Sequence, residues 1–369
     1  MEDKTMKAAK KALARDTTKT EDAPSLYFTT GHTILDLVVG AGEAAGFGMG
    51  YLEGTIVRDH GDSGSSKSYK ATECIAANYH KYKGKFRWRY CDPENGNTFD
   101  TQSLYGFDMF GGQEDYGRDV ATVQDWDWDL NKWLDSLKPD ECGVYVLDSL
   151  DSVTDCDTVA RKLKRREAYD KDKEFDEGSY MMSMQKFLSQ EFFRELTCKL
   201  KKKHAILYII SQERANVGAG MYAPKSRTSG GEALKFYESA RIVSKLRQKD
   251  EIKDRAVSAI IQTTAEKVRH TRPFRKCFVT IHFTYGIDSL GDELDFLYNF
   301  RTPEGELKKK KDGALKVTWD DSEEMTRDEL FKYIEEHKLR KEVKRRVIEA
   351  WEAIEDSIKI QRPAKFEED

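Results

Sequence analysis

The residues with the clearest chemical pattern are Gly61-Asp62-Ser63-Gly64-Ser65-Ser66-Lys67-Ser68. They nearly satisfy the phosphate-binding pattern G-x-x-x-x-G-K-S/T, with Ser66 in place of the second glycine. In such a loop, successive backbone N–H groups and a helix N-terminus point at phosphate oxygens. Lys67 is expected to reach the β- and γ-phosphates, and the Ser68 hydroxyl to bind Mg²⁺. We include the next residue, Tyr69, in the predicted nucleotide site. The alternative interpretation of the whole segment is a Gly/Ser-rich surface turn.

The residues on either side of this loop predict the strands and the helix that a phosphate-binding loop needs. Gly54–His60 is typical of a strand that leads into the loop, and the apolar spacing behind the loop predicts a helix. Phe86–Cys91 alternates in polarity and ends at Asp92-Pro93-Glu94, as a strand does when it enters a turn. Strand, loop, helix and strand form a βαβ unit, which favours the phosphate-binding interpretation.

Two further apolar segments end in polar residues that could serve the same site. Val144–Leu147 predicts a short strand that stops at Asp148, and Ala205–Ile210 predicts a strand followed by Ser211-Gln212. In an open parallel sheet, ligands bind beyond the carboxyl ends of the strands. Asp148 is therefore expected to hold Mg²⁺, directly or through water, with a helix N-cap as the alternative.

The second half of the predicted core contains one long helix, one glycine-rich segment and three strands. Residues 155–178 carry a basic run and then an acidic run, which indicates an exposed loop or a solvated helix. Residues 180–203 predict a long helix, and residues 215–231 a loop of a length that is usually functional. The strands that follow are expected at Arg241–Leu246, Ala256–Lys267 and Cys277–Phe283.

Composition favours a soluble, cytoplasmic protein. The chain has 369 residues, 38% of them hydrophobic and 35% charged, and a net charge of −4. This charge argues against wholesale coating of nucleic acid but permits a local basic groove. The six cysteines are scattered, without a C-x-x-C pair, which indicates reduced thiols. No apolar run is long enough for a bilayer, and the N-terminal residues lack the apolar core of a signal peptide, so we expect no membrane partner.

We expect three parts along the chain. Residues 1–30 are an N-terminal helical arm, which either frays or docks on a neighbouring subunit. Residues 31–290 form the main α/β core, and residues 291–369 a small C-terminal α/β domain. Within this last part, the capping box at Thr326–Glu329 predicts the start of a helix.

Five segments follow one another along the chain: the turn Thr30–Asp36 before the phosphate loop, Asp92-Pro93-Glu94, Val146–Ser149, Ile210–Arg214, and Gly230-Gly231-Glu232-Ala233-Leu234-Lys235-Phe236-Tyr237 followed by Arg241. Taken in order, they resemble the RecA recombinases, and especially the phage-encoded RecA/UvsX type. The last segment is the most specific match, and the resemblance covers about residues 28–295.

The resemblance implies a RecA-like P-loop NTPase core, a central mostly parallel sheet flanked by helices, with ATP and Mg²⁺ as cofactors. Glu94 is then expected to orient the attacking water, and Gln212 to sense the γ-phosphate. Lys267 and Arg269 match basic positions that reach the nucleotide of the adjacent subunit. The aromatic residue that stacks on adenine in bacterial members has no counterpart near Thr101–Leu104, which leaves the base preference open.

The resemblance also implies DNA-binding loops at about 157–179 and 214–231. Arg194, Gly230 and Gly231 match positions near the single-stranded DNA. Further predicted DNA contacts in or next to the second loop are Arg214, Lys225, Arg227 and Lys235. The function implied is that of an ATP-dependent recombinase that forms helical filaments on single-stranded DNA and pairs it with double-stranded DNA. Single-strand-binding and mediator proteins would be further partners, and a phage-encoded protein would act in the host cytoplasm.

Two alternatives keep the same fold. One is a DNA-coating scaffold that is switched by nucleotide and hydrolyses it weakly, because the Cβ of Ser66 strains the loop if that position needs a positive φ. The other is a ring-forming RecA-type helicase motor. The glycine-rich segment 215–231 and the Gly230–Arg241 match favour the recombinase over the helicase.

Overall fold

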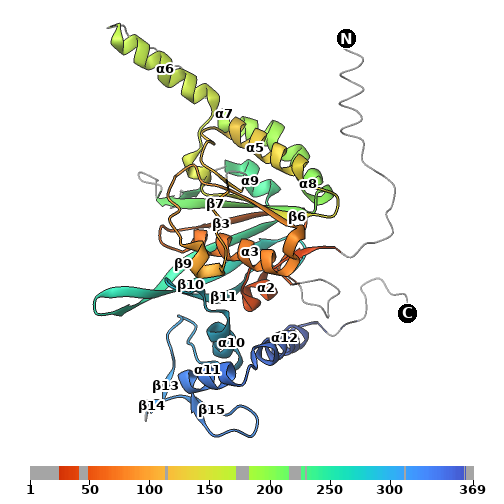
Figure 1. Ribbon diagram of the computed structural model, residues 1–369, viewed down its shortest axis with the longest axis vertical. Coiled ribbons are helices and arrows are strands. Elements are labelled where there is room, and N and C mark those ends of the chain that lie inside the picture. The colour runs from red at the N-terminus through yellow and green to blue at the C-terminus, as the bar shows by residue number, and fades with distance from the viewer. Residues whose placement is uncertain are drawn as a thin grey trace.

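The computed structural model describes residues 25–40, 49–112, 115–171, 183–215, 226–228, 231–310, 313–360 and 362. Figure 1 shows a central sheet with helices on both sides and a smaller helical part next to one edge of it. Most of the predicted N-terminal arm lies outside the described residues, and so does much of the predicted loop 214–231.

The strand with the phosphate loop at its end lies near the middle of a ten-stranded sheet of order β12-β11-β10-β9-β3-β7-β6-β4-β5, in which β8 pairs with β7. β3 pairs in parallel with β7 and β9, and β6 joins β7 to β4 in parallel. The main strands are β3 (Ile56–Gly61), β4 (Phe86–Cys91), β6 (Cys142–Leu147), β7 (Ala205–Ala215), β9 (Ala240–Ile252), β10 (Arg255–Val268) and β11 (Arg275–His282). The short ones are β5 (Tyr116–Gly117), β8 (Ser226–Thr228) and β12 (Gly286–Ile287). The predicted fold, a mostly parallel central sheet flanked by helices, is confirmed.

Two hydrophobic clusters cover the two faces of this sheet. Along β6, Val144 and Val146 belong to one cluster and Tyr145 and Leu147 to the other. This alternation follows from the two-residue period of a strand, since both faces are buried in a parallel sheet. The first face is covered by α2 (Thr33–Val39) and α3 (Lys67–Tyr82), and the second by α5 (Val123–Ser136), α8 (Phe193–Lys202) and α9 (Gly231–Tyr237).

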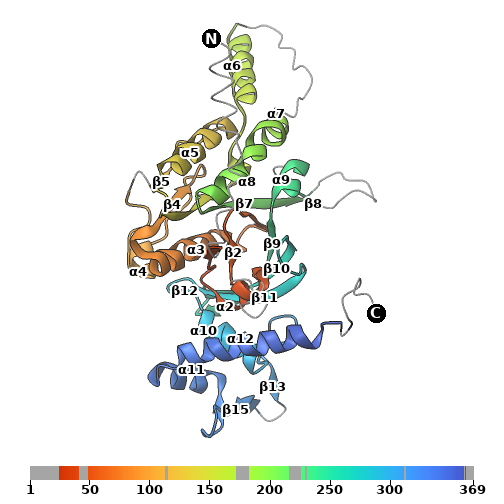
Figure 2. The ribbon, with the colours of Figure 1, turned by 90° about the vertical axis from the view of Figure 1, so that its right-hand side faces the viewer.

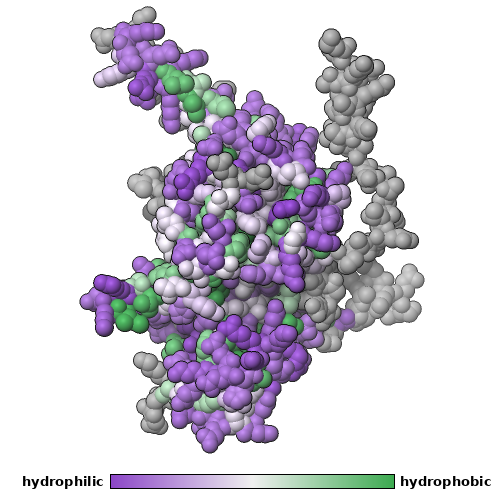
Figure 3. Space-filling view, viewed as in Figure 1, coloured by the Kyte–Doolittle hydropathy of each residue, from purple (hydrophilic) through white to green (hydrophobic). Residues whose placement is uncertain are grey.

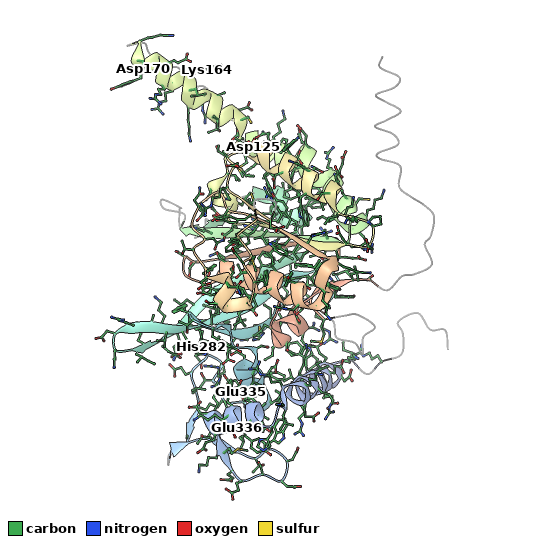
Figure 4. The ribbon with its side chains drawn as sticks, in the orientation of Figure 1. Asp125, Lys164, Asp170, His282, Glu335 and Glu336 are labelled. Carbon is green, nitrogen blue, oxygen red and sulfur yellow. The ribbon has the colours of Figure 1, made fainter. Side chains whose placement is uncertain are left out.

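Three predictions about single elements need correction. Residues 157–170 were expected in a DNA-binding loop, but Cys156–Asp170 is the helix α6, capped by Asp155 and without a buried residue. This agrees with the solvated-helix alternative, because most of its side chains are charged or polar and none is buried. Figure 1 shows α6 projecting from the body, and Figure 4 shows Lys164 and Asp170 near its far end.

The strand expected to end at Ile210 is β7, and it continues to Ala215 because its end pairs with β8. The expected loop 214–231 therefore contains the end of β7 and the short strand β8. The helix expected over 180–203 is divided into α7 (Ser183–Phe187), a π-helical turn (Leu188–Phe192) and α8.

β9 is much longer than the strand expected at Arg241–Leu246, whereas β10 nearly matches the strand expected at Ala256–Lys267, and the two form a hairpin. It turns at Lys253 and Asp254, which both have a positive φ, and projects beyond the edge of the body. Figure 3 shows a hydrophobic patch on this projection within a mostly hydrophilic surface, and Ile252 near the tip is 61% exposed.

The C-terminal part packs against the first face of the core. Its helices are α10 (Ser289–Leu297), α11 (Arg327–Glu336) and α12 (Arg340–Ser357), and Val343 and Val347 belong to the same hydrophobic cluster as α2 and α3. The capping box at Thr326 and Glu329 is present. The boundary expected at residue 290 falls inside α10, so the division into a core and a C-terminal domain stays a prediction.

All six cysteines are free. Within the described ranges, no group of His, Cys, Asp and Glu side chains is arranged to hold a metal ion by itself. None of the helices in the part of the chain that the structure describes has the length and apolarity needed to cross a membrane.

Candidate nucleotide site

The phosphate loop connects β3 to α3 through two positions with unusual backbone requirements. A Cβ at Gly61 would lie 2.1 Å from the carbonyl oxygen of Ser244, so the close approach of β9 requires glycine there. Gly64 has a φ of 76°, with open space around it. Ser66 has a φ of 56° and a ψ of 34° and makes no side-chain cap. The positive φ foreseen for this position is present, and it costs a residue with a Cβ about 1 kcal/mol.

Lys67 is the first residue of α3 and lies inside the loop. Its ammonium donates hydrogen bonds to the carbonyl oxygens of Gly61 (3.0 Å) and Asp62 (2.8 Å) and to the hydroxyl of Ser65 (3.2 Å). Burial lowers the pKa of Lys67, although the nearby carboxylate of Asp59 opposes this effect. The cation is thus held at the base of the loop, where a phosphate bound to the backbone N–H groups would meet it.

The side chains expected to bind Mg²⁺ contact one another. The Ser68 hydroxyl donates to Asp148 Oδ2 at 2.6 Å, and the Tyr90 hydroxyl donates to the same oxygen at 2.6 Å. Burial raises the pKa of Asp148, and these two hydrogen bonds counteract it. Asp148 does not cap a helix here, since Ser149 is the residue before the 3-10 turn Leu150–Ser152, and its role as a Mg²⁺ ligand stays a prediction. A hydroxyl and a carboxylate are oxygen donors of the kind that Mg²⁺ prefers, so this pair fits the ion.

Glu94 follows the end of β4, and Gln212 lies on β7, with β6 between these two strands. Both residues are held by polar groups of the segment after β6. Glu94 Oε1 accepts hydrogen bonds from the hydroxyls of Ser149 and, at 2.7 Å, of Ser152. The backbone N–H of Gln212 donates to Asp151 Oδ2 at 2.7 Å. Both residues are therefore oriented by the same short segment.

A cavity of about 410 Å³ joins these residues. Its lining includes Ser63, Gly64 and Ser66–Tyr69 of the loop, together with Glu94, Asp148 and Gln212. This volume lies in the range of small-ligand sites, roughly 300–1,000 Å³. The predicted metal residues thus face one cavity together with Lys67, Glu94 and Gln212, whereas Gly61, Asp62 and Ser65 of the predicted nucleotide site do not line it.

The sequence interpretation missed several residues of this cavity. Phe99 and Phe283 line it beside Tyr69, whose ring centroid lies 4.4 Å from that of Phe99 and 6.4 Å from that of Phe283. No local pattern marks these aromatics, because they come from three separate segments. Ser152 and Asp151 were also missed: they hold Glu94 and Gln212 without lining the cavity, and their position just after a strand end was an available signal.

Lys267 and Arg269 do not line the cavity of their own chain. The Lys267 ammonium donates to the carbonyl oxygen of Lys235 at 2.6 Å, and the Arg269 guanidinium donates to that of Phe236 at 2.5 Å. Both cations thus lie at the C-terminal end of α9, where the exposed carbonyl groups favour positive charge.

The residues expected to contact DNA are only partly described. Arg194 is exposed on α8, and Lys235 lies on α9. Arg214 on β7 pairs with Arg227 on β8, although nothing is described of either side chain. Gly231 begins α9, whereas Lys225 and Gly230 lie outside the described residues.

A parallel sheet with a phosphate loop after a central strand, and with polar residues at the neighbouring strand ends, defines a RecA-like α/β core. Comparison with known proteins agrees with this class. The RecA N-terminal domain family matches residues 150–288, which include β7, β9, β10 and β11 but not the phosphate loop.

The curated relatives carry the name Protein RecA. The one from Clostridioides difficile (strain 630) is 26% identical over 272 residues, which are 72% of this chain and 68% of the relative. The one from Chlamydia abortus (strain DSM 27085 / S26/3) is 28% identical over 328 residues, 87% of this chain and 82% of the relative. The one from Thermus aquaticus is 32% identical over 137 residues, 37% of this chain and 38% of the relative. Together with the family match, these similarities support a RecA-family protein.

Proposed function

We propose that this protein is an ATP-dependent DNA recombinase. It forms helical filaments on single-stranded DNA, pairs them with double-stranded DNA and hydrolyses ATP in response to DNA. The observation that carries the proposal is the single cavity faced by the phosphate loop, Glu94, Asp148 and Gln212. The motifs quoted from the sequence support the phage-encoded RecA/UvsX type as the finer assignment, with single-strand-binding and mediator proteins as further partners.

Phosphoryl transfer needs mainly positioning and neutralisation of charge. The residues of one subunit supply both. The loop N–H groups and Lys67 bind the phosphates, Ser68 and Asp148 hold Mg²⁺, and Glu94 orients the attacking water. When bound, Mg²⁺ neutralises part of the charge on the phosphates. The hydroxyls of Ser149 and Ser152 fix the carboxylate of Glu94, which keeps its oxygen in place for the water.

Lys267 and Arg269 act on the nucleotide of the adjacent subunit. Their absence from the lining of the cavity of their own chain supports this role, since finger residues can be supplied by a neighbour. A head-to-tail contact that does not close generates a helical filament. Two ligands that stabilise the same arrangement of subunits strengthen each other's binding, which is how DNA stimulates hydrolysis.

Phosphate release by the purified protein, with and without single-stranded DNA, tests this function. We expect Lys67→Ala to abolish hydrolysis in both conditions. The matched control is Lys85→Ala, because that side chain is 68% exposed and lies only loosely against Asp140 at 4.0 Å. Unchanged turnover by Lys67→Ala would refute the assignment of the site.

Electron microscopy with single-stranded DNA and a non-hydrolysable ATP analogue tests the assembly. Regular right-handed filaments agree with the recombinase, and closed hexamers with the helicase motor.

The backbone of Ser66 favours one second candidate, a DNA-coating scaffold with weak hydrolysis. The left-handed conformation of this residue places a strained position directly before the phosphate-binding lysine. If this strain limits turnover, Ser66→Gly raises the rate of hydrolysis and leaves DNA binding unchanged. If wild-type protein already hydrolyses ATP rapidly on DNA, the scaffold is excluded.

A further inference from the structure

Three cationic side chains lie next to one another across three strands of the sheet. Arg58 on β3 is directly opposite Arg241 on β9, and Arg241 is opposite Lys267 on β10. Residues that lie opposite each other in a sheet project from the same face. Arg58 is 1% exposed, so this row of positive charge is buried at its inner end and requires a negative partner.

Glu238, the residue after α9, is that partner. Its side chain is fully buried. Oε1 accepts a hydrogen bond from Arg241 Nε at 2.5 Å, and Oε2 lies 3.6 Å from an Nη of Arg58. Its backbone N–H donates to the carbonyl oxygen of Leu234 at 2.9 Å, which continues the hydrogen bonding of α9. Burial lowers the pKa of Arg58, and the charge of Glu238 opposes this effect. The carboxylate of Glu238 thus links α9 to the row of cationic side chains.

The row reaches the nucleotide cavity at one end. Arg58 Nε donates to the hydroxyl of Ser211 at 3.1 Å. Ser211 is fully buried and directly precedes Gln212, which lines the cavity. Because buried side chains in a close-packed interior move together, a shift of Arg58 is transmitted to this strand end.

At its other end, the row reaches the proposed finger residues. Lys267 belongs to the row itself, and both Lys267 and Arg269 donate to carbonyl groups of the last turn of α9. α9 begins at Gly231, the last residue of the segment proposed to bind DNA. Figure 2 shows α9 beside α8, and the stacked rings of Phe193 and Tyr237, 5.4 Å apart, hold it there.

We propose that Glu238 is a positioning residue that couples DNA binding to ATP hydrolysis. DNA held by the segment before α9 fixes the position of this short helix. Through Glu238, the position of the helix then determines the positions of Arg58 and Ser211, next to the nucleotide of the same subunit. In the same way it determines the positions of Lys267 and Arg269, which act on the nucleotide of the neighbouring subunit. This inference rests on the proposed recombinase function.

Glu238→Gln tests the coupling, because glutamine keeps the size of the side chain and removes its charge. We measure kcat and KM for ATP with and without single-stranded DNA, together with DNA affinity. We expect DNA stimulation of kcat to fall at least tenfold. KM, the rate without DNA and the affinity for DNA should each stay within threefold of wild type.

Asp295→Asn is the matched control. Asp295 is also a buried carboxylate between two arginines, Arg301 at 2.6 Å and Arg327 at 2.5 Å, but it lies in the C-terminal part. Breaking either buried cluster destabilises the fold. Only Glu238→Gln should change DNA stimulation, and an equal loss in both variants would show a general effect of stability and overturn the inference.

The outcomes separate this inference from the proposed function. If DNA does not stimulate wild-type protein, the recombinase proposal fails. If wild-type protein is stimulated and Glu238→Gln is stimulated equally, the recombinase proposal stands and the coupling role of Glu238 is refuted. If Glu238→Gln does not fold, Ser211→Ala replaces it, since it removes the hydroxyl that accepts the hydrogen bond of Arg58 and leaves Glu238 paired with both arginines. Full stimulation of Ser211→Ala then refutes the coupling.

Discussion

The two glycines of the phosphate loop provide a sharp test of its geometry, because each is required for a different physical reason. At Gly61 an added Cβ would approach the backbone oxygen of Ser244 to 2.1 Å. At Gly64 no atom lies within 4 Å of such a Cβ, but the φ of 76° disfavours it. The first position is limited mainly by contact between strands, with its φ of 155° as a further limit, and the second only by the conformation of its own backbone.

The expected costs follow from these two reasons. Gly61→Ala must push β3 and β9 apart, and overpacking of this kind costs about 1–3 kcal/mol. Gly64→Ala meets no neighbour and costs about 1 kcal/mol, the penalty of a left-handed residue with a Cβ. Asparagine tolerates this conformation better than alanine does. Gly64→Asn should therefore be more stable than Gly64→Ala, whereas Gly61→Asn should be no better than Gly61→Ala.

Urea denaturation of the four variants, followed by circular dichroism without nucleotide, measures the order of stability. Each asparagine variant serves as the control for the alanine variant at the same position. If asparagine rescues Gly61 as well as Gly64, or neither of them, the distinction between contact and backbone conformation is wrong. The geometry derived for the phosphate loop would then be refuted as well.

Three other predictions concern the site and its surroundings. Asp148→Asn should lower the Mg²⁺-dependent affinity for nucleotide at least tenfold, measured with a fluorescent analogue, and unchanged affinity would contradict its role as a ligand. The double variant Ser149→Ala/Ser152→Ala should lower kcat several-fold at constant KM, because it frees Glu94; a change in KM alone would argue against this orienting role. Burial raises the pKa of Glu73 from 4.5 to about 7. Between pH 4.5 and about pH 7 the folded state therefore binds more protons than the unfolded state, and the free energy of unfolding falls as the pH rises through this window. Glu73→Gln should accordingly raise the free energy of unfolding by about 3 kcal/mol at pH 8 but by less than about 1 kcal/mol at pH 5; an equal gain at both values would refute this.

The aromatic residues of the cavity and the length of β7 are two features that were not predicted from the sequence. Tyr69 was included as the neighbour of Ser68, but Phe99 and Phe283 come from segments without a motif. β7 extends to Ala215 because β8 pairs with it, and that pairing depends on residues 11 or more positions further along the chain. Apolar patterns mark where a strand is buried and do not show how far an exposed strand continues.

By itself, the sequence determined the features that depend on neighbouring residues. The phosphate loop, the alternation of buried residues in β6 and the capping box at Thr326 are local, because backbone conformation and side-chain direction follow from a few adjacent residues. Tertiary structure alone decided which distant groups meet. It brought Glu94 to Ser149, Arg58 to Ser211, and both Arg58 and Arg241 to Glu238. These contacts depend on strand order and register, which are set by packing of the whole sheet and carry no signal at any single position.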